Sequence, residues 1–229
     1  MSQKIELKDY NPQWEKWFEQ ESKEVKNILG KNCAAVVHVG STAIKGMKSR
    51  NCVDLMVLVK DIFQAEECKE GLEQAGYVLK ESYGDAGRHL YVKEGAEPAF
   101  QLHFYENEDY EDIQRMVAFR DYMEAHKEIG ISYAALKEEY ALQDEESYQA
   151  AKGTFIKETW KEAIPWHEAQ HKKNMALTMG VCSGVPIGVI AGFAAANWLL
   201  GIGAGILFGC CIGGAVFLAM KKKKTEEDC

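Results

Sequence analysis

The sequence predicts a mixed α/β (α+β) domain, in which a sheet flanked by helices comes first and a helical region follows. Short β-branched or aromatic runs predict five strands, at residues 34–39, 53–59, 77–82, 89–93 and 100–105. Large apolar residues then recur at helical spacing from about residue 107 to 171. A third observation separates the tail, because no Asp, Glu, Lys, Arg or His stands between residues 175 and 220.

The elements of the domain each have a local signal. Residues 4–7 alternate and predict a short strand, and Pro12 is expected at the first position of a helix that Gly30 ends. Residues 53–59 are apolar almost throughout, which is typical of a buried central strand. A helix is expected over 62–75. Three further helices should complete the domain, the last of them ending at Pro165.

Charge and cysteine content narrow the class of protein. The chain has 27 Lys and Arg against 35 Asp and Glu, a formal net charge of −8, so no nucleic-acid partner is expected. A small phosphorylated ligand remains compatible with this charge, because one pocket can be locally basic. The seven cysteines have neither CxxC nor zinc spacing, which favours free thiols in a reducing compartment.

The uncharged tail predicts a membrane anchor. We expect a soluble domain over residues 1–170, a membrane hairpin over 171–224 with spans near 175–196 and 198–220, and a cytoplasmic tail over 225–229. Lysines flank both ends of the apolar stretch, which places the domain and both ends of the tail in the cytoplasm. One tilted span is the alternative. The turn is expected near Asn197 and Trp198.

Glycine spacing within the tail suggests how its helices pack. Two series recur every four residues, Gly180, Gly184, Gly188, Gly192 and Gly201, Gly205, Gly209, Gly213. Such stripes let helix backbones approach closely in lipid, so a glycine-zipper hairpin and a possible homo-oligomer are expected. The alternative is that membrane helices are simply rich in glycine. The lipid bilayer is then a partner through residues 175–220.

The segment that carries chemistry is HVGSTAIKGMKSRNCVDLMVLV, residues 38–59. A turn at Gly40 and Ser41 can offer N–H groups and a hydroxyl to a phosphate. Asp54 on the following buried strand can hold a divalent metal. A carboxylate in an apolar strand is costly without a partner, which favours a functional role.

These residues resemble the GrpB-like family of the nucleotidyltransferase superfamily. The resemblance covers nearly all of residues 1–170 and continues through RHLYVK (88–93), QLHFYE (101–106), FRDYMEAH (119–126), YAALK (133–137) and YQAAKGTFI (148–156). It implies a nucleotidyltransferase-like mixed sheet with flanking helices. In active members of the superfamily, the Gly-Ser turn binds nucleotide phosphates and carboxylates hold the metals, which implies a catalytic role for Asp54.

The sequence departs from that pattern at the metal ligands. Met56 stands where a second carboxylate is expected, and a thioether is a poor ligand for magnesium. His103 stands where a third carboxylate would be useful. Asp54 and His103 could together hold one divalent ion, Mg or Mn. The family usually has Pro at positions 45 and 51 and His at position 101.

Five other polar residues in the matching motifs are candidates for ligand binding. They are Arg88, His89, Arg120, Lys137 and Lys152. The alternative for each is an ordinary surface charge or an ion pair. Gly40 and Ser41 could likewise only form the turn, and His103 could be a core histidine.

The leading hypothesis is a membrane-tethered protein that binds a nucleotide or a related phosphorylated small molecule, with possible metal-dependent nucleotidyl transfer. The alternative is a non-catalytic module that uses the same pocket as a sensor or adaptor. A third hypothesis makes the glycine hairpin the working part, and the absence of ionisable groups within it argues against this.

Overall fold

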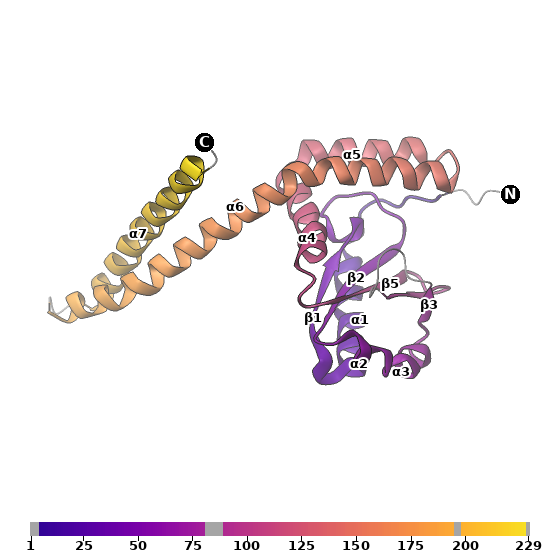
Figure 1. Ribbon diagram of the computed structural model, residues 1–229, viewed down its shortest axis with the longest axis horizontal. Coiled ribbons are helices and arrows are strands. Elements are labelled where there is room, and N and C mark those ends of the chain that lie inside the picture. Colours follow the sequence, from indigo (N-terminus) through magenta and orange to yellow (C-terminus); the bar gives the residue numbers. More distant parts are fainter. Residues whose placement is uncertain (1–4, 81–88, 195–197, 228–229) are drawn as a thin grey trace. The chain divides into compact units, whose positions relative to one another are not determined.

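The computed structural model describes residues 5–80, 89–194 and 198–227 (Figure 1). The chain divides into two compact units, Met1–Ile164 and Pro165–Cys229. The first unit contains the sheet, and the described residues of the second unit form helices. The expected mixed α/β architecture with flanking helices is confirmed for the first unit.

The sheet has five strands in the order β1-β2-β5-β4-β3. They are β1 (Cys33–Val39), β2 (Cys52–Val59), β3 (Val78–Lys80), β4 (Leu90–Lys93) and β5 (Ala99–Glu106). The pair β2 and β5 is parallel, and the other three pairs are antiparallel. The strand β2 therefore lies inside the sheet, as its apolar run predicts.

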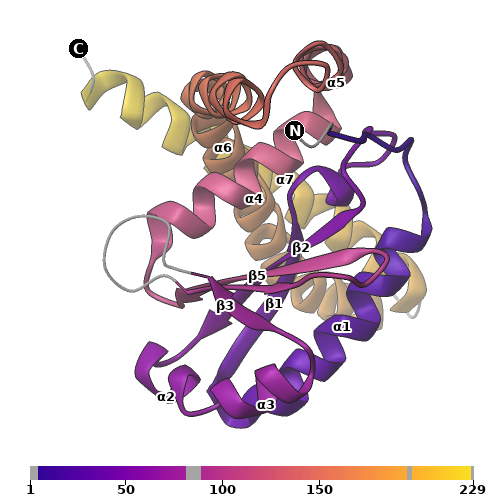
Figure 2. The ribbon, with the colours of Figure 1, turned by 90° about the vertical axis from the view of Figure 1, so that its right-hand side faces the viewer.

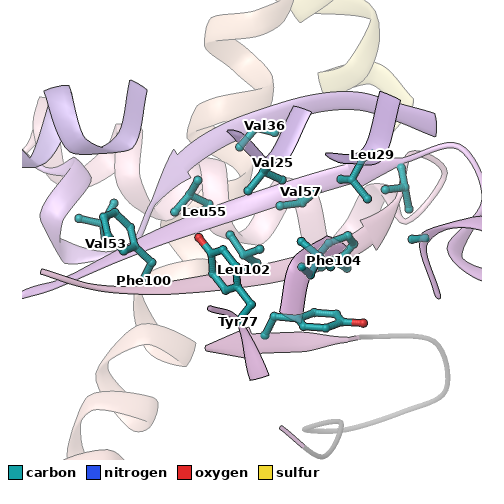
Figure 3. Packing of buried hydrophobic residues seen from close by; sticks show 14 of the residues in the cluster. Val25, Leu29, Val36, Val53, Leu55, Val57, Tyr77, Phe100, Leu102 and Phe104 are labelled. Carbon is teal, nitrogen blue, oxygen red and sulfur yellow. The ribbon is translucent and has the colours of Figure 1, made fainter. Parts of the chain in front are cut away.

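One face of the sheet packs against α1 (Gln13–Leu29) (Figures 2 and 3). Val53, Leu55 and Val57 on β2 enter this core with Leu102 on β5. Val25 and Leu29 of α1 cover them (Figure 3). Because side chains alternate along a strand, this packing commits Asp54 and Met56 to the opposite face.

The opposite face is covered by α4 (Tyr110–Ala125), with α5 (Lys127–Tyr140) and α6 (Glu145–Ala194) following it in the chain. Met56 and Tyr105 are buried there among apolar residues of α4. Met56 and Asp54 thus share one face, as expected. Met56 is fully enclosed in the core, whereas the side chain of Asp54 is 24% exposed.

The helix boundaries differ in three places from those expected from the sequence. The expected helix over 62–75 is two helices, α2 (Ile62–Glu66) and α3 (Lys69–Gln74). The N–H of Cys68 bonds to the carbonyl of Ala65, a tight turn that separates them. Pro12 caps α1 and does not open it, and Gly30 ends it at φ 55° as expected. Helix α6 continues through Pro165, where the sequence predicts that the helix ends.

The predicted strand at residues 4–7 is wrong over the part that is described. Ile5, Glu6 and Leu7 belong to no strand, and the nearest pairing is an isolated bridge between Lys8 and Ser49. Ile5 is buried against Ala141 and Tyr148, so its apolar character reflects packing beneath the helical region. Lys4 lies outside the described residues.

The second unit contains the end of α6 and α7 (Trp198–Glu227). Within the residues that the structure describes, neither these helices nor any others combine the length and apolar character needed to cross a membrane. The expected hairpin over 171–224, with its spans at 175–196 and 198–220 and its glycine stripes, is therefore not supported. The expected turn residue Asn197 lies outside the described residues.

Candidate functional site

A cavity of about 240 Å³ lies on the face of the sheet that carries Asp54. Its polar lining comes from β2, β5 and the loop between β1 and β2: Gly40, Ser41, Ser49, Arg50, Cys52, Asp54, Gln101 and His103. Its apolar lining comes mainly from α4, α5 and α6: Met116, Phe119, Tyr133, Tyr148, Ile156 and Trp160. Lys152 of α6 adds a second cation beside Arg50.

The floor of the cavity is formed where Gly40 meets Asp54. Gly40 follows β1 at φ +72°, a conformation that favours glycine. A Cβ built at Gly40 would lie 2.2 Å from Oδ2 of Asp54 and 2.9 Å from its Cγ. The turn therefore needs glycine twice, for its backbone angle and for the room that the carboxylate occupies.

Asp54 and His103 form a pair across neighbouring strands. Nε2 of His103 lies 3.3 Å from Oδ1 of Asp54, and the two side chains are 25% and 24% exposed. Burial acts to raise the pKa of Asp54, but the hydrogen bond and charge of His103, with the charges of Lys152 and Arg50, outweigh it. The net result is a pKa below the usual value. Asp54 is thus an ionised carboxylate facing cations.

The two cationic side chains of the lining differ in the contacts that the protein makes with them. Nη1 of Arg50 lies 3.2 Å from Oε1 of Glu145, and its guanidinium lies over the ring of Tyr148. Lys152 makes no hydrogen bond or ion pair in the described part of the chain. Burial, first, and the charge of Arg50 lower the pKa of Lys152, while Asp54 acts to raise it. Lys152 is therefore a half-buried amine close to the other polar groups of the cavity.

The remaining polar groups of the lining are neutral. Burial raises the pKa of the Tyr133 phenol, and the neighbouring Ser41 acts to lower it. Burial raises the pKa of the Cys52 thiol to about 12, so this thiol stays protonated at neutral pH and is a poor nucleophile. Ser41 and Cys52 are therefore neutral groups of the lining.

Of the residues that the sequence predicts for the site, the structure brings together Gly40, Ser41, Asp54, His103 and Lys152. Lys137 is close but does not line the cavity. It is 1% exposed, its Nζ donates to the carbonyl of Lys48, and it lies over the ring of Tyr133. Lys137 supports a lining residue and does not present its charge to a ligand.

Two predicted ligand-binding residues lie elsewhere. Arg120 donates to the carbonyl of His38 at 2.8 Å, pairs with Asp121 at 2.7 Å and lines a separate polar groove beside α1. Its position on α4 turns it toward β1 and away from Asp54. His89 is paired with Glu66 at 3.1 Å outside the cavity. Arg88 lies outside the described residues.

Sequence reasoning missed most of the helical wall. Tyr133, Tyr148 and Trp160 recur at the same spacing as buried core residues, and indeed Tyr133 and Tyr148 are 1% and 2% exposed. One signal was available, since Tyr133 and Tyr148 open the two family-matching motifs that also contain Lys137 and Lys152. These two motifs match the family although they lie far along the chain from residues 38–59. Their match suggests that they contribute to the same site as residues 38–59.

The donor set does not fit a resident divalent metal. In the described part of the chain, no three His, Cys, Asp or Glu side chains gather around one point, and the cavity offers one carboxylate and one imidazole. Mg²⁺ needs near-octahedral oxygen ligands, and Mn²⁺ also favours oxygen. Arg50 and Lys152 add positive charge that would repel a cation. Asp54 and His103 satisfy each other instead.

Comparison with known proteins gives a consistent result. The family model for GrpB protein matches residues 4–162. The UPF0157 protein YqkA of Bacillus subtilis is 32% identical over 174 residues, covering 75% of this chain and 50% of YqkA, so the chain spans about half the length of that relative. The glutamate-rich protein GrpB of Alkalihalophilus pseudofirmus is 27% identical over 68% of this chain and 94% of its own.

Solved structures extend the comparison to the fold. The crystal structure of GrpB from Enterococcus faecalis superposes with a TM-score of 0.67 at 29% identity, over 71% of this chain and 99% of that one. A cytoplasmic RNA terminal U-transferase gives a TM-score of 0.42 at 16% identity, over 57% of this chain and 40% of that one.

Proposed function

The chain belongs to the GrpB family, and on this premise we propose that it binds a phosphorylated small molecule, such as a nucleotide, in the cavity beside Asp54. One observation carries the proposal. The amine of Lys152 enters a half-enclosed cavity without any hydrogen bond or ion pair from the described residues. An anionic ligand would supply that partner.

The energetic argument rests on the cost of an unpaired charge. An ammonium removed from water without a partner is destabilising by several kcal/mol, a cost that an oxyanion beside it offsets. Arg50 is held by Glu145 and by the ring of Tyr148, so its guanidinium is oriented before a ligand arrives. The two cations of the lining, Arg50 and Lys152, favour a phosphate over a neutral group.

The turn at Gly40 and Ser41 supplies the next contact. Ser41 lines the cavity, and its hydroxyl can donate a hydrogen bond to an incoming phosphate. Asp54, held by His103, would repel a phosphate placed directly against it. The carboxylate is better suited to accept a hydrogen bond from a ligand hydroxyl, and so to orient the rest of the molecule.

Nucleotidyl transfer is the finer proposal, with Asp54 as the acidic residue of the reaction. Its place on β2 next to the Gly40–Ser41 turn supports it, as does the family resemblance. Against it stands the single carboxylate among the described lining residues, with Met56 buried where a second would act. A ligand sensor or adaptor without turnover is therefore the second candidate function.

The test is ligand binding by the full chain. A thermal-shift series with nucleoside mono-, di- and triphosphates, each with and without Mg²⁺ or Mn²⁺, should raise the melting temperature for at least one phosphorylated compound but not for its nucleoside. Lys152→Met should abolish the shift. The matched control is Lys157→Met, an exposed lysine on the same helix. No shift with any phosphorylated compound would remove the proposal.

Turnover separates the two candidates. Transfer predicts release of pyrophosphate or incorporation of a nucleotidyl group that disappears in Asp54→Ala. A sensor predicts that Asp54→Ala changes ligand affinity while no product forms in either protein.

A further inference from the structure

We infer that the cavity takes a compact phosphate monoester with an apolar or aromatic group, and that Lys152 and Arg50 neutralise its phosphate without a divalent metal. This inference rests on the proposed function, since it names the ligand class of the same cavity. It differs from the metal-bound triphosphate that the fold resemblance implies.

The charges of the cavity carry the first step. Lys152 and Arg50 are cationic, and Asp54 is the one carboxylate that lines the cavity among the described residues. Asp54 is already paired with His103 at 3.3 Å, and Arg50 with Glu145 at 3.2 Å. The unpaired charge is therefore that of Lys152. A lysine amine at this position supplies to the phosphate the positive charge that a metal would otherwise bring.

The size of the cavity carries the second step. At about 240 Å³ it has room for roughly eight water molecules, taking ~30 Å³ for each. Pockets for drug-sized ligands are larger, on the order of 300–1,000 Å³. A phosphate with one ring fills the available space, whereas a whole nucleoside triphosphate would leave much of its length outside.

The aromatic lining of the cavity carries the third step. Phe119, Tyr133, Tyr148 and Trp160 present aromatic surface to the cavity from three helices. The indole Nε1 of Trp160 is the one buried side-chain nitrogen or oxygen in the described residues that lacks a hydrogen-bond partner. This lining suits a flat apolar group.

Calorimetry with the full chain and simple probes tests the inference. The probes are inorganic phosphate, phenyl phosphate, phenol and ATP, each titrated in EDTA and again with Mg²⁺. We expect phenyl phosphate to bind in EDTA, at least tenfold more tightly than inorganic phosphate, and with an affinity that Mg²⁺ leaves within twofold. Phenol should not bind measurably.

Variants locate the site. Lys152→Met should weaken phenyl phosphate at least tenfold, Lys152→Arg should retain most of the affinity, and Lys157→Met should match wild type. If Lys152→Met does not fold, the comparison of probes on the wild-type protein still decides the question.

The outcomes separate this inference from the proposed function. Binding of ATP only with Mg²⁺, and none of phenyl phosphate, would overturn the compact metal-free ligand and leave phosphorylated-ligand binding intact. Binding of phenyl phosphate that EDTA abolishes would overturn the role given to Lys152. No binding of any phosphorylated probe, including those of the thermal-shift series, would overturn both.

Discussion

Gly40 and Asp54 touch so closely that the smallest side chain at position 40 would collide with the carboxylate. The Cβ would lie 2.2 Å from Oδ2 of Asp54, and Gly40 has a φ of +72°. The turn after β1 and the acidic residue on β2 are therefore one structural unit. Any change at Gly40 must displace the group on which the cavity is built.

Gly40→Ala should destabilise the protein by about 1–3 kcal/mol, because it combines a strained backbone with a collision. Denaturant unfolding measures this, and loss of phosphorylated-ligand binding should accompany it. Gly46→Ala is the matched control, since Gly46 has φ +79° with nothing within 4 Å of its Cβ. Equal destabilisation of the two variants would show that contact with Asp54 adds nothing.

Asp54→Asn should change how stability depends on acid. The pKa of Asp54 is lowered in the folded protein, so its ionised form stabilises the fold above the unfolded pKa of about 3.9, and this contribution is lost as pH falls through the folded pKa. The variant should therefore show a shallower loss of unfolding free energy below about pH 4. Asp9→Asn, whose side chain is 88% exposed, is the control. Parallel curves for wild type and Asp54→Asn would contradict the assignment.

The position of Asp54 at a candidate site could be predicted from the sequence, because the signals are the Gly-Ser turn and the strand that follows it. A buried strand containing one carboxylate, thirteen residues after a Gly-Ser turn, requires a partner for that carboxylate. Alternation along β2 and β5 then places Asp54, Met56 and His103 on one face. These rules need no knowledge of how distant helices pack.

The helical wall could not be anticipated in the same way. Tyr133 and Tyr148 satisfy the pattern of a core helix, and periodicity does not distinguish a residue that fills a core from one that borders a cavity. Arg120 shows the reverse error. Its motif matches the family, but which groove it enters depends on the rotation of α4 against β1, and it bonds to the carbonyl of His38. The membrane hairpin that the uncharged tail predicts is not supported by the described helices.

His38→Gln should reduce the acid sensitivity of the fold between pH 6.5 and 4. Burial, first, and the charge of Arg120 lower the pKa of His38 to about 4, while Asp54 acts to raise it. The unfolded chain binds a proton in this interval that the folded chain does not, so wild-type stability should fall by up to about 3 kcal/mol as pH decreases. Unfolding at several pH values measures it. His171→Gln, at an exposed position, should retain the wild-type slope.

Residues 1–170 should fold without the rest of the chain. The buried clusters of the first unit draw on residues no later than Trp160, and Ala163 is the last buried residue before the boundary of that unit. The shortened protein should therefore unfold cooperatively and bind the same phosphorylated probes as the full chain. Circular dichroism and calorimetry check both. A loss of cooperative unfolding would show that the second unit stabilises the first.

Lys137→Met should change how the unfolding free energy depends on pH, because it removes a buried amine. Burial, first, and the charges of Lys152 and Arg50 lower the pKa of Lys137 to about 7, while Glu138 acts to raise it. Between pH 7 and about 10, Lys137 holds a proton in the unfolded chain but has lost it in the folded protein. The contribution of Lys137 to the unfolding free energy of the wild-type protein therefore rises with pH.

The measured quantity is the difference in unfolding free energy between wild type and Lys137→Met, because the loss of this amine is what distinguishes the two proteins. The difference should shift in favour of wild type by roughly 4 kcal/mol from pH 7 to 10. The value of this difference at pH 7 depends on how much the hydrogen bond to the carbonyl of Lys48, which the variant lacks, stabilises the wild type. The same difference for Lys157→Met should stay flat. If the difference for Lys137→Met is also independent of pH, the amine stays charged inside the fold. The carbonyl of Lys48 and the ring of Tyr133 would then stabilise the ammonium.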